Sequence, residues 1–119
     1  MSAERPRVYV VQQPLRLNSR GEISPKFDLS PAAEYGEVVN LLSSSAKPFD
    51  SKAVIAEMAS KLAGYCDDDY LLLTGNPCLI GWATSIAAHH NGGRVRMLQW
   101  SGTERRYVAL RARLPHSGD

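Results

Sequence analysis

The chain has 119 residues, 44% of them apolar and 22% charged, which fits one globular domain over residues 1–119. No apolar run approaches the roughly 18 residues that a membrane-spanning helix needs. The first residues also lack the basic flank and apolar stretch of a secretory signal. We therefore expect a cytoplasmic protein in which Cys66 and Cys78 are reduced.

The net charge of +2 hides an asymmetry along the chain. Residues 1–93 carry eight Lys and Arg against ten Asp and Glu, whereas residues 94–119 carry six Arg against two acids. An excess of arginine at one end indicates either an anionic partner or the solvated face of a pair of strands.

The first 42 residues predict two strands and one short helix. Residues 7–11 are rich in β-branched and aromatic side chains, as in a buried strand. Residues 14–28 mix Pro, Asn and Gly with charge and show no period, so we expect a loop. Ser30, followed by proline, starts a helix that Gly36 limits to one turn. Residues 37–42 favour a second strand, with a helix as the competing interpretation.

A longer helix is predicted after Asp50, its expected N-cap residue. Its apolar side chains recur with helical spacing along one stripe. The stripe consists of Val54, Met58, Leu62 and Tyr65. Gly64 closes this helix.

The second half of the chain alternates strand and helix. Residues 70–74 form a continuous apolar run, as in a central strand covered on both faces. Residues 77–91 predict a helix that is apolar nearly all round, so it is either buried or faces a partner. Residues 94–100 and 105–114 predict two strands joined by a short turn, hence a hairpin. In the last strand we expect one core face and one wet, basic face.

The order of these elements predicts the sheet. A helix between two strands favours a right-handed crossover, so residues 70–74 and 94–100 should pair in parallel beneath helix 77–91. The expected fold class is α/β: a small mixed sheet of four to five strands with a parallel β-α-β unit, two main helices and a C-terminal antiparallel hairpin. We expect residues 1–6 and 115–119 to be flexible.

Polar residues collect at the carboxyl edge of this sheet, where open α/β sheets bind ligands. Gly75 and Asn76 precede a helix N-terminus, which attracts anions. Arg105 and Arg106 in the hairpin turn would add bidentate anion recognition. These four residues predict a nucleotide- or phosphometabolite-binding site. The competing interpretation is a plain strand-to-helix turn, because the stretch lacks the spacing of a known phosphate loop.

The opposite edge collects the acids Asp67–Asp69 and the histidines His89 and His90. Their spacing matches no metal template, so we predict a solvated loop beside a helix end and no metal site. Cys78 lies near a helix N-terminus, which can activate a thiol, but the apolar run after it favours burial. No arrangement of residues predicts a catalytic group, and no cofactor is expected.

The hairpin combines arginines with aromatic rings, the mix that nucleic-acid-binding surfaces use for phosphates and bases. The predicted partner-binding residues are Arg94, Arg96, Trp100, Tyr107, Arg111 and Arg113. The low net charge opposes a broad nucleic-acid footprint, so non-specific nucleic-acid binding is the weaker alternative. The surplus apolar face of helix 77–91 would also suit assembly into a homo-oligomer.

Four stretches stand out as a set: FDLSPAAEYGE at residues 27–37, DDYLLLTGNP at 68–77, LQW at 98–100 and ERRY at 104–107. Together they resemble a group of small proteins encoded by tailed bacteriophages. The resemblance carries over no functional residue. It implies a phage accessory protein in the cytoplasm of an infected bacterium. Such a protein is expected to bind and modulate a host or phage macromolecule rather than to catalyse a reaction.

Overall fold

The computed structural model describes residues 6–25 and 28–116. The strands are β1 (Arg7–Gln12), β2 (Leu15–Leu17), β3 (Ile23–Pro25), β4 (Glu37–Leu42), β5 (Tyr70–Leu72), β6 (Arg94–Ser101) and β7 (Arg106–Arg113). The helices are the 3-10 helices η1 (Ser30–Tyr35) and η2 (Pro48–Asp50) and the α-helices α1 (Ser51–Lys61) and α2 (Pro77–His90). The ends that the sequence predicts to be flexible lie mostly outside the described residues.

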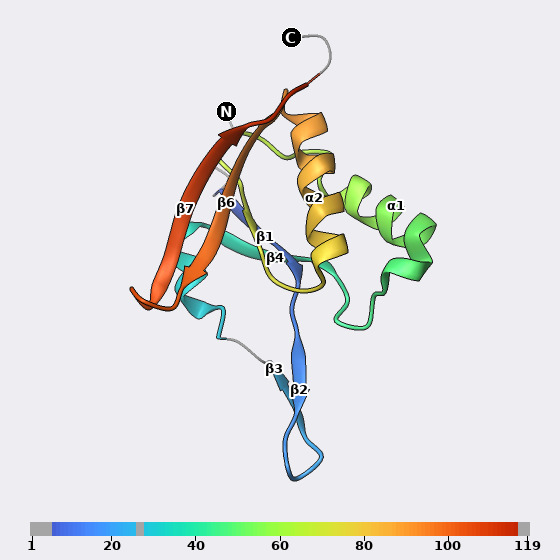
Figure 1. Cartoon of the computed structure of the whole chain (residues 1–119), viewed down its shortest axis with the longest axis vertical. Coiled ribbons are helices and arrows are strands. Elements are labelled where there is room, and N and C mark those ends of the chain that lie inside the picture. The colour runs from blue at the N-terminus through green and yellow to red at the C-terminus, as the bar shows by residue number, and fades with distance from the viewer. Residues whose placement is uncertain (1–5, 26–27, 117–119) are drawn as a thin grey trace.

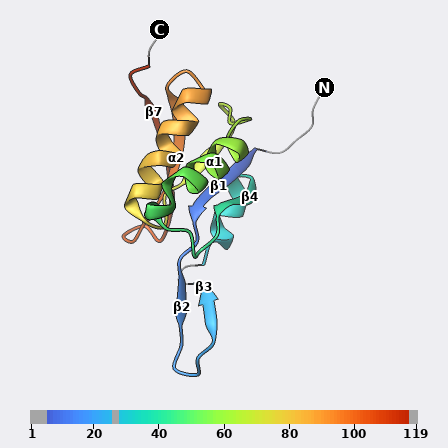
Figure 2. The ribbon, with the colours of Figure 1, turned by 90° about the vertical axis from the view of Figure 1, so that its right-hand side faces the viewer.

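Five strands form one mixed sheet in the order β4-β1-β5-β6-β7. β7 runs antiparallel to β6, and the other neighbours are parallel. The helices α1 and α2 lie on one side of this sheet (Figure 1). β2 and β3 form a separate antiparallel ribbon that projects away from it (Figure 2). The predicted α/β fold with a parallel β-α-β unit, two main helices and a C-terminal hairpin is confirmed.

The two faces of the sheet bury separate sets of side chains, because successive residues of a strand point to opposite sides. Tyr9 and Val11 of β1 belong to the larger cluster, which includes residues of α1 and α2. Val8 and Val10 pack with Ala32 of η1 in the smaller cluster. The sheet is therefore covered on both sides, which explains the unbroken apolar sequence of β1.

Residues 14–28 are not the plain loop that the sequence predicts, since they contain the strands β2 and β3. The turn of this ribbon is organised by Asn18, whose Oδ1 accepts the backbone N–H groups of Arg20 and Glu22, both at 2.9 Å. Each strand has only three residues. That length is too short for an alternating pattern to stand out among neighbouring Pro, Asn and Gly residues.

Residues 37–42 form strand β4, so the strand interpretation is confirmed. α1 ends at Lys61, earlier than the predicted stop at Gly64. Leu62 has φ −90° and ψ 1°, which turns the chain out of the helix. Tyr65 nevertheless stays in the core cluster that the helix supplies.

The sequence predicts that one face of β7 packs on the core and the other faces solvent, and the structure contradicts this for Tyr107 and Leu110. Tyr107, on the expected wet face, is only 5% exposed, whereas Leu110, on the expected core face, is 40% exposed. The reason is η1, which packs over the Tyr107 side of the sheet. The Tyr35 hydroxyl at the end of η1 donates a hydrogen bond to the Tyr107 carbonyl at 3.1 Å.

Gln12 joins three segments at the carboxyl end of β1. Its amide nitrogen donates to the carbonyls of residues 43, 44 and 46 at 3.3, 3.4 and 2.8 Å, and its Oε1 accepts the Asn76 N–H at 3.2 Å. The residue is buried, so these bonds replace bonds to water. Gly75, with φ 109°, passes so close that an added Cβ would lie 2.6 Å from Gln12 Cβ. Glycine is therefore required at that position.

Replacing Gln12 with alanine should lower the free energy of unfolding by about 2–3 kcal/mol, because buried polar backbone groups lose their partner. Chemical denaturation measures this change. Gln13→Ala is the matched control. Gln13 is adjacent and half-buried, but its side chain makes no hydrogen bond within the described residues. An equal loss in both variants would contradict the role of Gln12.

Candidate functional site

The register of β6 and β7 brings the predicted partner-binding residues onto one face of the hairpin. The facing pairs are Arg94 with Arg113, Arg96 with Arg111, and Trp100 with Tyr107. Facing residues point to the same side of a sheet, as do residues two apart on one strand. The side chains of Arg94, Arg96, Arg111 and Arg113 form what we call the arginine face.

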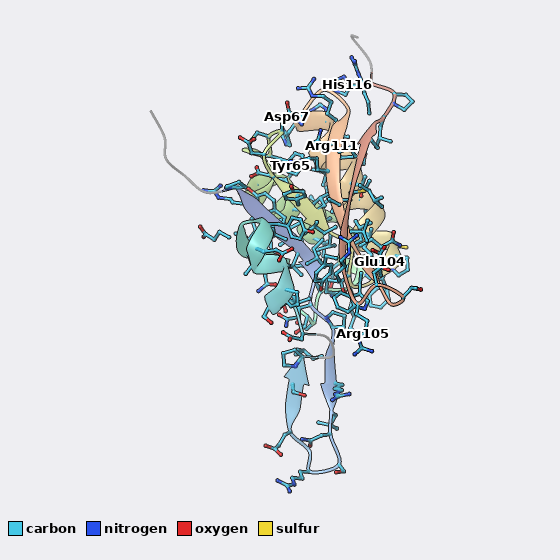
Figure 3. All side chains as sticks on the ribbon, turned by 90° about the vertical axis from the view of Figure 1, so that its left-hand side faces the viewer. Tyr65, Asp67, Glu104, Arg105, Arg111 and His116 are labelled. Atoms are coloured by element: carbon cyan, nitrogen blue, oxygen red, sulfur yellow. The ribbon has the colours of Figure 1, made fainter. Side chains whose placement is uncertain are left out.

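A groove of about 500 Å³ lies along the arginine face. All four arginines line it, together with Tyr65, Asp67 and Asp68 from the connection between α1 and β5. In Figure 3, Tyr65, Asp67 and Arg111 lie at the same end of the molecule. The groove is therefore at the amino end of β5, opposite the edge where the sequence predicts a ligand. We call it the arginine groove.

Asp67 neutralises one arginine of the groove. Its Oδ1 accepts a hydrogen bond from Asn91 Nδ2 at 2.9 Å and one from Arg94 Nε at 3.0 Å. The Asn91 amide and the Arg94 guanidinium hold the pKa of the Asp67 carboxyl below its ordinary value. Both partners of the ion pair are solvent-exposed, so it contributes little to stability. It does hold the Arg94 guanidinium beside Asp67, and both residues line the groove.

Arg96 is held by two tyrosines. Its guanidinium carbon lies 4.1 Å from the centroid of the Tyr70 ring, a cation–π contact. The Tyr65 hydroxyl accepts the Arg96 N–H at 3.0 Å and donates to the Arg96 carbonyl at 3.2 Å. Burial raises the pKa of Tyr65, so the hydroxyl keeps its proton for this donation. Arg96 Nε is buried without a hydrogen-bond partner among the described residues.

Trp100 and Tyr107 lie at the other end of the same face. Their ring centroids are 5.1 Å apart in an edge-on arrangement. Trp100 is 47% exposed, whereas Tyr107 is buried and therefore offers a partner little surface. Both line a second hollow of about 300 Å³ beside η1. This hollow also contains Asp28, whose pKa is lowered by the backbone N–H of Ser30. An acidic and mostly apolar hollow suits a neutral or cationic group better than a phosphate.

The four residues predicted to bind a nucleotide occupy two different settings. The Asn76 N–H is bound to Gln12 Oε1, and Asn76 Oδ1 accepts the Cys78 N–H at 2.8 Å, so both groups have partners. Arg105 takes φ 55° in the exposed turn of the hairpin, and Arg106 pairs with Glu104 at 2.7 Å. Neither the arginine groove nor the hollow beside η1 is lined by Gly75, Asn76, Arg105 or Arg106. Their role in ligand binding stays a prediction.

The acids at the amino edge do not behave as one solvated loop. Asp69 is buried, and its carboxylate accepts the backbone N–H groups of Arg7 at 2.9 Å and Cys66 at 3.1 Å. It thus ties the start of β1 to the start of β5. His89 packs edge-on against His90, 5.3 Å between centroids. The described residues contain no group of three or more His, Cys, Asp or Glu placed to hold a metal ion.

Cys78 is exposed in the first turn of α2, so the prediction of burial is wrong. The apolar run after it does reach the core, but from the next position onward: Leu79, Ala83 and Ala87 are fully buried. Cys66 is exposed as well, and both cysteines are free thiols.

The surplus apolar side chains of α2 are used within the molecule. Ile80, Trp82 and Ile86 are partly buried and pack against the core. Exposed apolar side chains occur instead on the ribbon, where Leu17 and Ile23 are 67% and 68% exposed. Sequence reasoning missed this surface because it assigned the segment to a loop. The segment does alternate as Leu-Arg-Leu and Ile-Ser-Pro around Asn18 and Gly21, but three residues on each side are too few to predict strands.

Fold and groove together define a small mixed α/β protein with an arginine-lined sheet face. The profile of the Phage Pam3 gp32-like protein family matches residues 6–114. The chain therefore belongs to that phage protein family, and the resemblance to small phage proteins is confirmed. Comparison with curated proteins and with solved structures found no match. Within the described residues no helix is long and apolar enough to cross a membrane.

Replacing Tyr65 with phenylalanine should cost about 1–2 kcal/mol of stability, because the Arg96 N–H and carbonyl lose their partner. It should also change the alkaline limit of stability. The folded-state pKa of Tyr65 is raised above the ordinary 10.0, so its contribution is complete below pH 10 and falls as the pH rises further. Denaturation from pH 8 to pH 11 should show a shallower decline in Tyr65→Phe. An unchanged slope would contradict the raised pKa.

Proposed function

We propose that this phage-encoded chain is a non-enzymatic protein that binds and modulates a host or phage macromolecule in the infected cell. The proposed contact surface is the arginine face of β6 and β7, with the exposed ring of Trp100 on the same side. The membership of a phage protein family supports the setting.

The observation that carries the proposal is the pairing of like charges. Arg94 faces Arg113 and Arg96 faces Arg111 on adjacent strands. Like charges directly opposite each other destabilise a sheet. Asp67 offsets this repulsion at Arg94, but Arg96 and Arg111 have no carboxylate within ion-pair distance among the described residues. An acidic partner would offset the repulsion between these arginines. Binding such a partner would therefore lower the electrostatic energy of the arginine face.

Two other functions compete with this one. The first is a nucleotide or phosphometabolite site at Gly75, Asn76, Arg105 and Arg106. It is disfavoured by the partners that Asn76 and Arg106 already have. The second is non-specific nucleic-acid binding by the arginine face, which predicts an affinity that falls steeply with salt.

Charge reversal at Arg111 tests the proposal. Arg111→Glu should reduce capture of the partner from a lysate of infected cells by about tenfold or more, because it replaces attraction with repulsion at the centre of the face. Arg105→Glu is the matched control. It makes the same change of charge at an exposed turn residue outside the groove. Quantitative mass spectrometry of the captured material measures both.

The pattern of loss decides among the three functions. Loss in Arg111→Glu alone supports the arginine face. Loss in Arg105→Glu alone supports the carboxyl-edge site and contradicts the proposal. Capture of nucleic acid without sequence preference, abolished by moderate salt, supports the third function instead. Circular dichroism of both variants checks that each is folded.

We also propose that any homo-oligomer forms through the ribbon rather than through α2. Leu15 faces Pro25 and Leu17 faces Ile23, so one side of the ribbon is entirely apolar. A two-stranded ribbon is only marginally stable in water when it stands alone. A second copy offers the same apolar side, which satisfies the self-complementarity of a two-fold interface.

The double variant Leu17→Ser, Ile23→Ser should be monomeric in sedimentation velocity at a concentration where the unchanged protein is dimeric. Arg16→Ser is the control, because Arg16 lies on the other side of the ribbon, facing Ser24. An unchanged protein that sediments as a monomer at millimolar concentration would refute this route to an oligomer.

A further inference from the structure

Arg96 and Arg111 form a pair of cations at the centre of the arginine groove. They face each other across β6 and β7, so their Cβ atoms are about 5 Å apart. Arg96 is half-buried and fixed against Tyr70, whereas Arg111 is exposed. One guanidinium is thus held in place and the other can adjust to a ligand beside it.

The acids around this pair offset its charge only in part, although the Arg96 charge contributes, after Asn91 and Arg94, to lowering the pKa of Asp67. The Asp67 carboxylate is already bound by Asn91 and Arg94. Asp68 lines the groove but forms no ion pair among the described residues. The four arginines that line the groove outnumber its two carboxylates, Asp67 and Asp68, by two, and the counterpart of that excess is a compact dianion. A carboxylate or a phosphodiester carries a single charge and would leave one guanidinium unmatched.

The choice of arginine rather than lysine also favours a dianionic phosphate. Arginine presents a planar fork of donors that binds phosphate oxygens in a bidentate manner, which lysine cannot do. Residues 94–119 contain six arginines and no lysine. The groove, at about 500 Å³, also has the size of a small-ligand site.

We propose that the arginine groove binds a phosphomonoester dianion between the guanidinium groups of Arg96 and Arg111. This inference rests on the proposed function, since it names the chemistry by which the same face would recognise its partner. The phosphate is that of a phosphorylated protein side chain, because the net charge of +2 opposes a nucleic-acid footprint, and a 5′-phosphorylated nucleic-acid end is the competing outcome of the test.

Titration with inorganic phosphate tests the chemistry directly. Phosphate at pH 7.5 and constant ionic strength should produce saturable NMR shifts of the Arg96 and Arg111 side-chain N–H signals. At pH 5.0 its affinity should fall about a hundredfold, because inorganic phosphate, with a second pKa of about 7, is mostly the dianion at pH 7.5 and only about one part in a hundred the dianion at pH 5.0. Sulfate, a dianion at both pH values, should bind equally at both.

The sulfate titration is the control that distinguishes protonation of the ligand from protonation of the protein. The ionisable groups around the pair are Tyr65, Asp67, Asp68, Tyr70 and the two outer arginines of the groove. Any change in them between pH 5.0 and 7.5 would alter sulfate binding too. Equal weakening of phosphate and sulfate at low pH would therefore overturn the dianion assignment, as would shifts that do not saturate.

Three variants locate the site. Arg111→Gln should weaken phosphate binding by about tenfold or more, since one charge-assisted pair of bonds is lost. Arg105→Gln, in the exposed turn, should leave binding unchanged. Asp68→Asn should strengthen binding, because it removes a negative charge from the groove wall. Equal effects of Arg111→Gln and Arg105→Gln would contradict the location.

Phosphoserine and a 5′-phosphorylated oligonucleotide, each beside its unphosphorylated form, distinguish the two sources of the group. A preference for phosphoserine over serine supports the proposal. A preference for the phosphorylated oligonucleotide alone, or no preference in either pair, refutes it. The proposed function can fail separately. If Arg111→Glu abolishes partner capture but phosphate does not bind, only this inference fails. If phosphate binds but capture is unaffected, only the proposed function fails.

Discussion

The mismatch in length between β5 and β6 underlies the whole arginine groove. β5 has three residues and β6 has eight, so the amino end of β6 extends beyond its parallel neighbour. Backbone groups left without a strand partner must be satisfied in another way. The Tyr65 hydroxyl does this for Arg96, accepting its N–H and donating to its carbonyl. The connection before β5 takes the place of a longer strand, and the groove is lined by Tyr65, Asp67 and Asp68 of this connection and by residues of β6 and β7.

Cover from η1 divides the same sheet face into two regions of different chemistry. Ala32 and Tyr35 of η1 pack over the middle of the face, against the cluster that contains Leu98 and Tyr107. The arginine groove lies on one side of this cover, and the hollow with Trp100 and Asp28 lies on the other. A partner that contacts Trp100 and the arginines together must therefore cross η1. This geometry favours a macromolecule over a small ligand for simultaneous contact with both regions.

Sequence patterns predicted the main strands and helices because these elements are long enough for the spacing of their apolar residues to be recognised. Strand β1, helix α2 and the hairpin all follow from composition and spacing, and parallel pairing follows from the order of elements. The burial of Tyr107 could not be predicted, since it depends on η1, which is distant in sequence. The register that brings Arg96 opposite Arg111 also required the structure, because a slip of one residue would reverse every side chain. The hairpin residues were identified individually, but their grouping into a groove with Tyr65 and Asp67 was not.

Open α/β folds usually bind ligands beyond the carboxyl ends of their strands. In this protein the arginine groove lies at the opposite edge, at the amino end of β5. Gln12 closes the carboxyl edge by binding three carbonyls and the N–H of Asn76, the residue that caps α2. Pro77 removes one further donor from the helix N-terminus. A phosphate at this point would have to displace bonds that hold β1, β4 and β5 together. The proposed phosphate site at the amino edge carries no such cost, because Arg96 and Arg111 face each other on the hairpin and their side chains can meet a ligand without breaking its backbone bonds.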